Sequence, residues 1–197
     1  YELGLLYIEQ QEMDKAREAL DMSVVLEPNA YKPHEALSLL NYREKKLENA
    51  ITEIAEAIKL DDKEPQLHLT LGKFLLESGK EEEAVKAFKE TASLFPENFS
   101  AQIRLADWYY VKGMLDESLE TYQVAENIDS DNPIIHSRLG KIYAGKNENK
   151  KAQISLEKAI KLNPADAESH YQLGKLVSAE GKMSRAQSLL SNAISLD

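Results

Sequence analysis

Apolar and polar residues follow one another along the chain with the period of an α-helix, in segments separated by short turns. In segment 68–75 the spacing i, i+3, i+4 and i+7 is occupied by His68, Leu71, Gly72 and Leu75. In segment 84–92 the spacing i, i+4, i+7 and i+8 is occupied by Ala84, Phe88, Thr91 and Ala92. Both spacings place one apolar stripe on one face of a helix. Gly79 lies between the two segments, and glycine tolerates the left-handed backbone that often ends a helix. The pattern predicts two amphipathic helices joined by a tight turn.

This two-helix pattern recurs every 34 residues, and the register never slips. One leucine position recurs at Leu3, Leu37, Leu71, Leu105, Leu139 and Leu173. The next position is always small: Gly4, Ser38, Gly72, Ala106, Gly140 and Gly174. A second small position, twelve residues after the first, recurs at Ala16, Ala50, Ala84, Ser118, Ala152 and Ala186. A bulky position recurs at Leu20, Ile54, Phe88, Tyr122, Leu156 and Leu190. Small residues let two helix backbones approach, and large residues opposite them fill the space.

The repetition predicts an all-α chain of six stacked units, each of which contacts only its neighbours. We expect the units to be residues 1–30, which is truncated at its start, 31–64, 65–98, 99–132, 133–166 and 167–197. Gly79, Gly113, Asn147 and Gly181 occupy the turn between the two helices of four units. Pro28, Pro96 and Pro164 close alternate units, because proline cannot continue a helix.

The fifth unit carries the clearest set of these residues: Leu139, Gly140, Tyr143, Ala152, Leu156, Ala159 and Pro164. In type and spacing they resemble the tetratricopeptide repeat (TPR) family, and the resemblance covers essentially the whole chain. The second unit departs from the pattern with Ser38, Asn41 and Asp62. The resemblance implies a right-handed superhelical solenoid. It also implies that the first helices of the repeats line a concave groove, which in this family accepts a peptide.

Composition narrows the classes of partner. Hydrophobic residues make up 43% and charged residues 29% of the chain, which suits amphipathic helices and is too apolar for a disordered chain. The formal charge of -10 disfavours nucleic acid and anionic membranes, since both require a broad basic face. No apolar stretch approaches the roughly 20 residues that cross a bilayer. We therefore expect a soluble protein without nucleic-acid binding or membrane insertion, and both cytoplasm and periplasm are compatible with it.

The residues that invite a catalytic interpretation have simpler structural explanations. The absence of cysteine excludes disulfides and thiolate chemistry. His34, His68, His136 and His170 share one repeat position. Equivalent residues on packed helices stand about 8–10 Å apart, whereas ligands of one metal each need a bond of about 2 Å. The acidic run 81–83 begins a predicted helix, where negative charge suits the helix dipole. We expect neither an enzyme nor a cofactor or metal site in this chain.

The positions that the family turns toward its groove suggest a binding surface. In the third to sixth units they carry Lys73, Arg104, Arg138, Lys141 and Lys175 against Glu77, Asp107 and Glu168. Tyr42, Tyr110 and Tyr171 occupy the same kind of surface. Our hypothesis is that this lane receives an acidic segment or a C-terminal carboxylate, with arginine giving bidentate contacts and lysine acting as a point charge. The alternative is an ordinary solvated surface. The candidate peptide-binding residues are Lys73, Arg104, Asp107, Tyr110, Arg138, Lys141, Tyr171 and Lys175.

Two functional classes follow. The first is a protein-protein interaction scaffold or adaptor that binds a peptide segment of another protein. The second is a substrate-recruiting TPR arm of a larger enzyme, such as a glycosyltransferase. The chain starts inside a predicted helix, and no polar cap follows the apolar residues Leu189, Leu190 and Ile194, although solenoids usually need one. We therefore expect a fragment of a longer protein, or a homo-oligomer formed through the uncapped ends.

Overall fold

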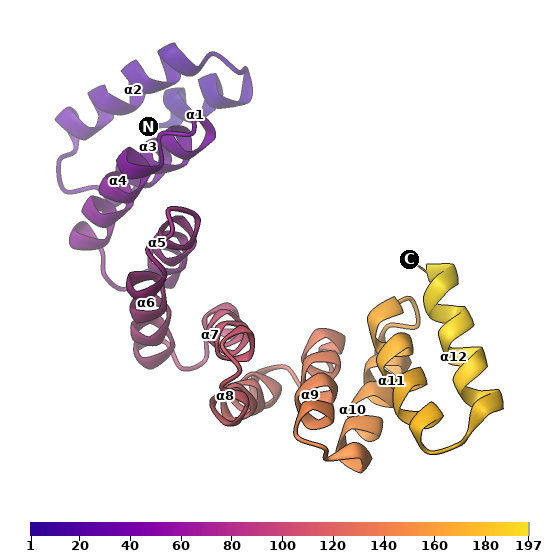
Figure 1. Cartoon of the computed structure of the whole chain (residues 1–197). Coiled ribbons are helices and arrows are strands. Elements are labelled where there is room, and N and C mark those ends of the chain that lie inside the picture. The colour runs from indigo at the N-terminus through magenta and orange to yellow at the C-terminus, as the bar shows by residue number, and fades with distance from the viewer. Residues whose placement is uncertain (197) are drawn as a thin grey trace. The chain divides into compact units, whose positions relative to one another are not determined.

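The computed structural model describes residues 1–196, and within that range it contains α-helices and no strand (Figure 1). The helices are α1 (Glu2–Glu9), α2 (Met13–Leu26), α3 (Tyr31–Arg43), α4 (Leu47–Leu60), α5 (Pro65–Glu77), α6 (Glu81–Leu94), α7 (Phe99–Val111), α8 (Leu115–Ile128), α9 (Pro133–Gly145), α10 (Asn149–Leu162), α11 (Ala167–Ala179) and α12 (Met183–Leu196). The all-α prediction is confirmed. Among the described residues, no helix combines the length and the apolar composition needed to cross a membrane.

Every first helix is followed by a turn residue in the left-handed conformation. Gly79, Gly113, Asn147 and Gly181 have φ values of 78°, 73°, 59° and 80°. The predicted role of these turn positions is confirmed. Gln11 and Lys45 adopt the same conformation, with φ values of 61° and 60°, although neither is a residue type that favours it. At the third turn, the Lys80 backbone N–H donates to the Leu75 carbonyl oxygen over 2.9 Å, which satisfies a carbonyl group left open at the helix end.

Small residues on the first helix face large residues on the second, as the repeat pattern predicts. A Cβ atom placed on Gly140 of α9 would lie 2.5 Å from Cγ of Leu156 on α10. Gly72 of α5 faces the ring of Phe88 on α6 with a similar lack of space. Leu156 and Phe88 are almost completely buried. The close approach of the two helices in a pair therefore depends on the missing side chain.

The chain forms two compact units, Tyr1–Ala101 and a second that begins at Gln102. In the first unit, one core cluster contains Ala16, Leu20, Ala36, Leu37 and Leu40, and another contains Ala50, Ile54, Ala57, Leu67 and Phe74. In the second unit, Leu156, Leu173, Val177 and Ala186 form a cluster. In both units the helices of a pair, such as α3 with α4 and α11 with α12, contact each other more extensively than consecutive pairs do.

Polar contacts also join consecutive pairs. Arg17 of α2 donates from Nη2 to Oδ1 of Asn41 and to Oε2 of Glu44, each over 2.9 Å. The Asn41 side chain, which departs from the family's aromatic residue, is only 3% exposed. The hydrogen bond from Arg17 therefore satisfies an amide group that would otherwise be costly to bury.

Candidate functional site

The sequence-predicted residues all lie on the first helices of the pairs. Lys73 is on α5 in the first unit. Arg104, Asp107 and Tyr110 are on α7, Arg138 and Lys141 on α9, and Tyr171 and Lys175 on α11, all in the second unit.

Two hollows lie between α9 and α11, and together we call them the α9–α11 furrow. The first, the Lys175 hollow, has a volume of about 420 Å³. Its lining includes Tyr110 of α7, Lys141 of α9 and Lys175 of α11, with the polar side chains Asn147, Asn149 and Gln172 beside them. Three predicted residues from three first helices therefore line one hollow.

The second, the Asp166 hollow, has a volume of about 310 Å³ and lies at the N-terminal ends of the same two helices. Its lining residues are Pro133, Ile134, Ser137, Arg138, Asn163, Asp166 and Glu168. It therefore contains the predicted Arg138 together with two carboxylates, one of which, Asp166, was not among the predicted residues.

An ion pair crosses the furrow from α9 to α11. Lys141 Nζ lies 2.9 Å from Glu168 Oε1, and the Lys141 side chain is only 17% exposed. Gln172 also donates to Glu168, over 2.8 Å. The hydrogen bond from Gln172 and the contact with Lys141 hold the pKa of Glu168 below its usual value. Because Lys141 lines one hollow and Glu168 lines the other, this bridge lies between them.

Asp107 and Arg138 are tied into the packing of α7, α8 and α9. The hydroxyl of Tyr122, which is fully buried, donates a short hydrogen bond to Asp107 Oδ1. Arg138 Nε lies 3.2 Å from the same carboxylate oxygen. Burial first, and then the hydrogen bond to Asp107, raises the pKa of Tyr122 above its ordinary value. The charge of Arg138 is thus balanced within the chain.

Lys175, Tyr171 and Arg104 are more open. Lys175 Nζ lies 5.3 Å from the centroid of the Tyr171 ring, within the range of a cation–π contact. Tyr171 is 45% exposed and lines a further hollow of about 630 Å³, together with Asp166, Glu168, Leu190 and Ile194. Arg104 is exposed on α7.

Lys73 belongs to a separate cluster in the first unit. Its Nζ atom lies 4.6 Å from the centroid of the Tyr42 ring and 4.0 Å from Glu77 Oε1. The Tyr42 hydroxyl donates to the same Glu77 oxygen over 2.9 Å, and the Tyr42 ring stacks on Phe74 at 4.8 Å. Tyr42 and Lys73 therefore form a joint surface of α3 and α5.

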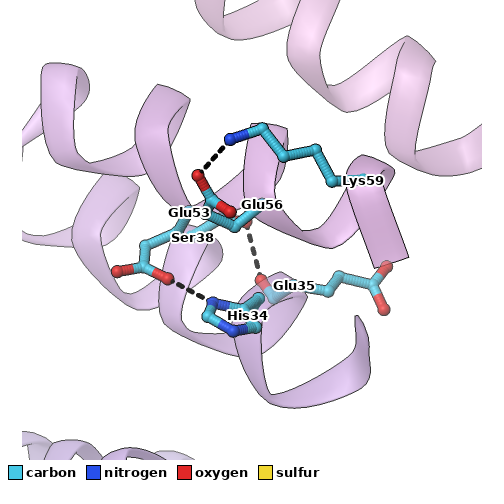
Figure 2. Close-up of polar contacts among 6 residues, drawn as sticks. All are labelled: His34, Glu35, Ser38, Glu53, Glu56 and Lys59. Atoms are coloured by element: carbon cyan, nitrogen blue, oxygen red, sulfur yellow. Dashed lines mark hydrogen bonds and ion pairs between the residues drawn. The ribbon is translucent and has the colours of Figure 1, made fainter. Parts of the chain in front are cut away.

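The four histidines hold turns and neighbouring helices. The Nε2 atoms of His68, His136 and His170 lie 3.0, 2.7 and 3.1 Å from carbonyl oxygens six residues earlier. A carbonyl oxygen can only accept, so these Nε2 atoms carry protons and have no lone pair for a metal. His34 Nδ1 lies 2.8 Å from Glu53 Oε2, and Figure 2 shows the two side chains pointing toward each other. Among the described residues, no group of three or more His, Cys, Asp or Glu side chains is placed to hold a metal ion.

Sequence reasoning missed Asp166, Ser137 and the amide side chains of the furrow. Asp166 directly precedes α11, at the repeat position that Glu64, Asn98 and Asn132 occupy before α5, α7 and α9. Such residues commonly cap helix N-termini, so Asp166 did not stand out. The one available signal was its aspartate charge beside the predicted groove positions.

Comparison with known proteins supplies the family. Models of the TPR family match residues 1–65, 65–98, 106–147 and 135–166, under the descriptions "Tetratricopeptide repeat" and "TPR repeat". No curated protein matches the sequence significantly.

Several solved structures share the fold. MamA from Desulfovibrio magneticus RS-1, residues 41 to the end, is 20% identical with a TM-score of 0.74, over 84% of this chain and 94% of that one. PilF of Pseudomonas aeruginosa is 19% identical with a TM-score of 0.76, over 95% of this chain and 86% of that one. YrrB, described as a TPR protein with an unusual peptide-binding site, is 17% identical with a TM-score of 0.74, over 92% of this chain and 93% of that one. The 34-residue pattern, the helix pairs and these matches agree: the chain belongs to the tetratricopeptide repeat family and has the fold of an all-α TPR solenoid.

Proposed function

We propose that this chain is a protein-protein interaction scaffold whose α9–α11 furrow binds a peptide segment of another protein. The observation that carries the proposal is the Lys175 hollow, where Tyr110, Lys141 and Lys175 from three first helices line about 420 Å³ of space. YrrB, a neighbour in fold, is described as having a peptide-binding site, which supports the same class of function for this chain.

The chemistry of the Lys175 hollow suits an extended peptide with an acidic residue. Among the described residues, Lys175 has no ion-pair partner, so its charge is available to a carboxylate. The amides of Asn147 and Asn149 can donate to and accept from a peptide backbone. Tyr110 supplies an aromatic face with a polar tip, a residue type that is enriched where proteins meet.

The proposal is tested by selecting peptides from a random display library on the purified chain and measuring the enriched peptides by fluorescence anisotropy. We expect Lys175→Gln and Tyr110→Ala each to weaken binding roughly fivefold to tenfold, about 1–1.4 kcal/mol, the range of a hydrogen-bonded charge or a buried aromatic contact. Lys150→Gln on α10 is the matched control, because Lys150 is exposed and outside the furrow, and it should bind like the wild type.

Two results would refute the proposal. No enrichment over a surface without protein would mean that the furrow is not a peptide site. Enriched peptides that bind Lys175→Gln and Tyr110→Ala as tightly as the wild type would place the site elsewhere on the chain. Circular dichroism of each variant separates loss of binding from loss of fold.

A further inference from the structure

We propose that the α9–α11 furrow selects a bipolar segment, with a basic residue at Asp166 and an acidic residue at Lys175. This inference rests on the proposed peptide-binding function and adds the charge pattern of the partner. It modifies the hypothesis that the lane receives an acidic segment, because the furrow carries two opposite charges at its two ends.

Most of the charges in the furrow are balanced within the chain, and two are not. Arg138 is paired with Asp107, and Lys141 with Glu168. Across the part of the chain that the structure describes, neither Asp166 nor Lys175 has an ion-pair partner. The furrow therefore offers one uncompensated negative charge at the N-terminal ends of its helices and one uncompensated positive charge toward their C-terminal ends.

Two serine hydroxyls hold the Asp166 carboxylate in place. Ser169 Oγ lies 2.5 Å from Asp166 Oδ2 and 2.9 Å from Ser137 Oγ. A hydroxyl has one proton, so Ser169 donates to the carboxylate and accepts from Ser137. Both serines are buried. Asp166 lines both the 310 Å³ hollow and the neighbouring 630 Å³ hollow, so an incoming cation can reach a carboxylate that is already fixed.

The backbone spacing of Asp166 and Lys175 along α11 sets the spacing of the charges in a matching peptide. Asp166 occupies the position directly before α11, and Lys175 lies nine positions later in the sequence. At 1.5 Å per helical residue, their backbones are about 13 Å apart along the helix. An extended peptide advances about 3.3 Å per residue. A matching segment therefore carries its basic and acidic residues about four positions apart.

The arrangement of charges in the furrow disfavours peptides with other charge patterns. The Lys141–Glu168 bridge already balances the middle of the furrow, so a charge in the centre of the segment gains little. A uniformly acidic peptide would meet Asp166, and a uniformly basic one would meet Lys175. Like charges at short range reduce affinity, which is how many interfaces reject wrong partners.

The test uses the library-enriched peptides with two neutralising variants of the full chain. Asp166→Asn keeps an oxygen that accepts from Ser169 but removes the charge, and Lys175→Gln removes the positive charge. Glu120→Gln and Lys150→Gln remove exposed charges outside the furrow and serve as matched controls. Each enriched peptide is also synthesised with its basic residue or its acidic residue replaced by glutamine.

We expect enriched peptides to share one basic and one acidic residue about four positions apart. Asp166→Asn should weaken binding about fivefold only for peptides that keep the basic residue, and Lys175→Gln about fivefold only for those that keep the acidic one. Enriched peptides that are uniformly acidic, or that bind Asp166→Asn as well as the wild type, overturn the bipolar pattern but leave the proposed function intact. Failure to enrich any peptide overturns both.

Discussion

Replacing Gly140 with alanine tests the close approach of α9 and α10. Inside a helix, alanine is normally about 1 kcal/mol more favourable than glycine. At Gly140 the new Cβ would lie 2.5 Å from Leu156 Cγ and 3.3 Å from the Leu156 backbone nitrogen. A side chain can rotate away from the new methyl group, but the Leu156 backbone nitrogen cannot. We therefore place the cost of overpacking at the upper end of its usual range, about 3 kcal/mol. The net loss in the free energy of unfolding should then be about 2 kcal/mol.

Gly145→Ala is the matched control on the same helix. Gly145 is exposed at the end of α9, and a Cβ there would lie 3.4 Å from Leu115 Cδ1, an ordinary contact. We expect this change to be neutral or to stabilise by about 0.5 kcal/mol, because only the glycine's conformational freedom is lost. Urea unfolding followed by the fluorescence of Trp108, the one tryptophan of the sequence and a residue of the second unit, measures both variants.

A double variant separates the steric effect from any other. Leu156→Ala alone should cost about 2–5 kcal/mol, because Leu156 is fully buried. In Gly140→Ala/Leu156→Ala, the added methyl group would occupy part of the emptied space. We therefore expect the pair to be at least about 1 kcal/mol more stable than the sum of the single changes. Simple additivity, or a Gly140→Ala variant as stable as Gly145→Ala, would refute the assigned contact.

Three further predictions follow from local contacts. Tyr122→Phe should lower the free energy of unfolding by about 1–2 kcal/mol in urea titrations, because it removes the buried hydroxyl that donates to Asp107; no change would mean that this hydrogen bond is not formed. Lys45→Gly should raise the free energy of unfolding by about 1 kcal/mol, because Lys45 holds a φ of 60° that glycine adopts without strain. The melting temperature measured by circular dichroism should rise accordingly, and a lower melting temperature would contradict the assigned strain. Glu168 has its pKa lowered, first by the hydrogen bond from Gln172. Its contribution to stability is therefore present above its unfolded-state pKa and is lost as the pH falls through the folded-state pKa. In urea titrations at a series of pH values, the free energy of unfolding of Glu168→Gln should therefore fall less steeply than that of the wild type below about pH 4.5, the usual glutamate range. An unchanged pH profile would contradict the prediction.

The repeat pattern predicts much of the fold because it records packing directly. The spacing of Gly140 and Leu156 indicates a close helix pair, and the structure has them in contact. The turn at Lys45 could not be predicted from residue type, since lysine does not favour a left-handed backbone. There the two helices of the pair determine the conformation of the residue between them.

The candidate site was less accessible to sequence reasoning. The period indicates which residues lie on first helices, and Tyr110 and Lys175 line one hollow in the structure. Which charges neutralise one another depends on the side-chain contacts between neighbouring repeats, as for Lys141 and Glu168. The sequence places five basic and three acidic residues at the predicted groove positions. It does not show that Lys175 has no acidic partner.

The unequal contacts within and between helix pairs have a mechanical consequence. Since α11 packs more extensively on α12 than consecutive pairs pack on each other, the seams between pairs are the weaker places under tension. A chain pulled from its ends should therefore yield one pair at a time and show a sawtooth force trace. Each tooth would release one 34-residue period, about 120 Å of extended chain. A protein built in this way lengthens stepwise under load, and the proposed α9–α11 furrow, which spans one such seam, would be lost as soon as either of its two pairs yields.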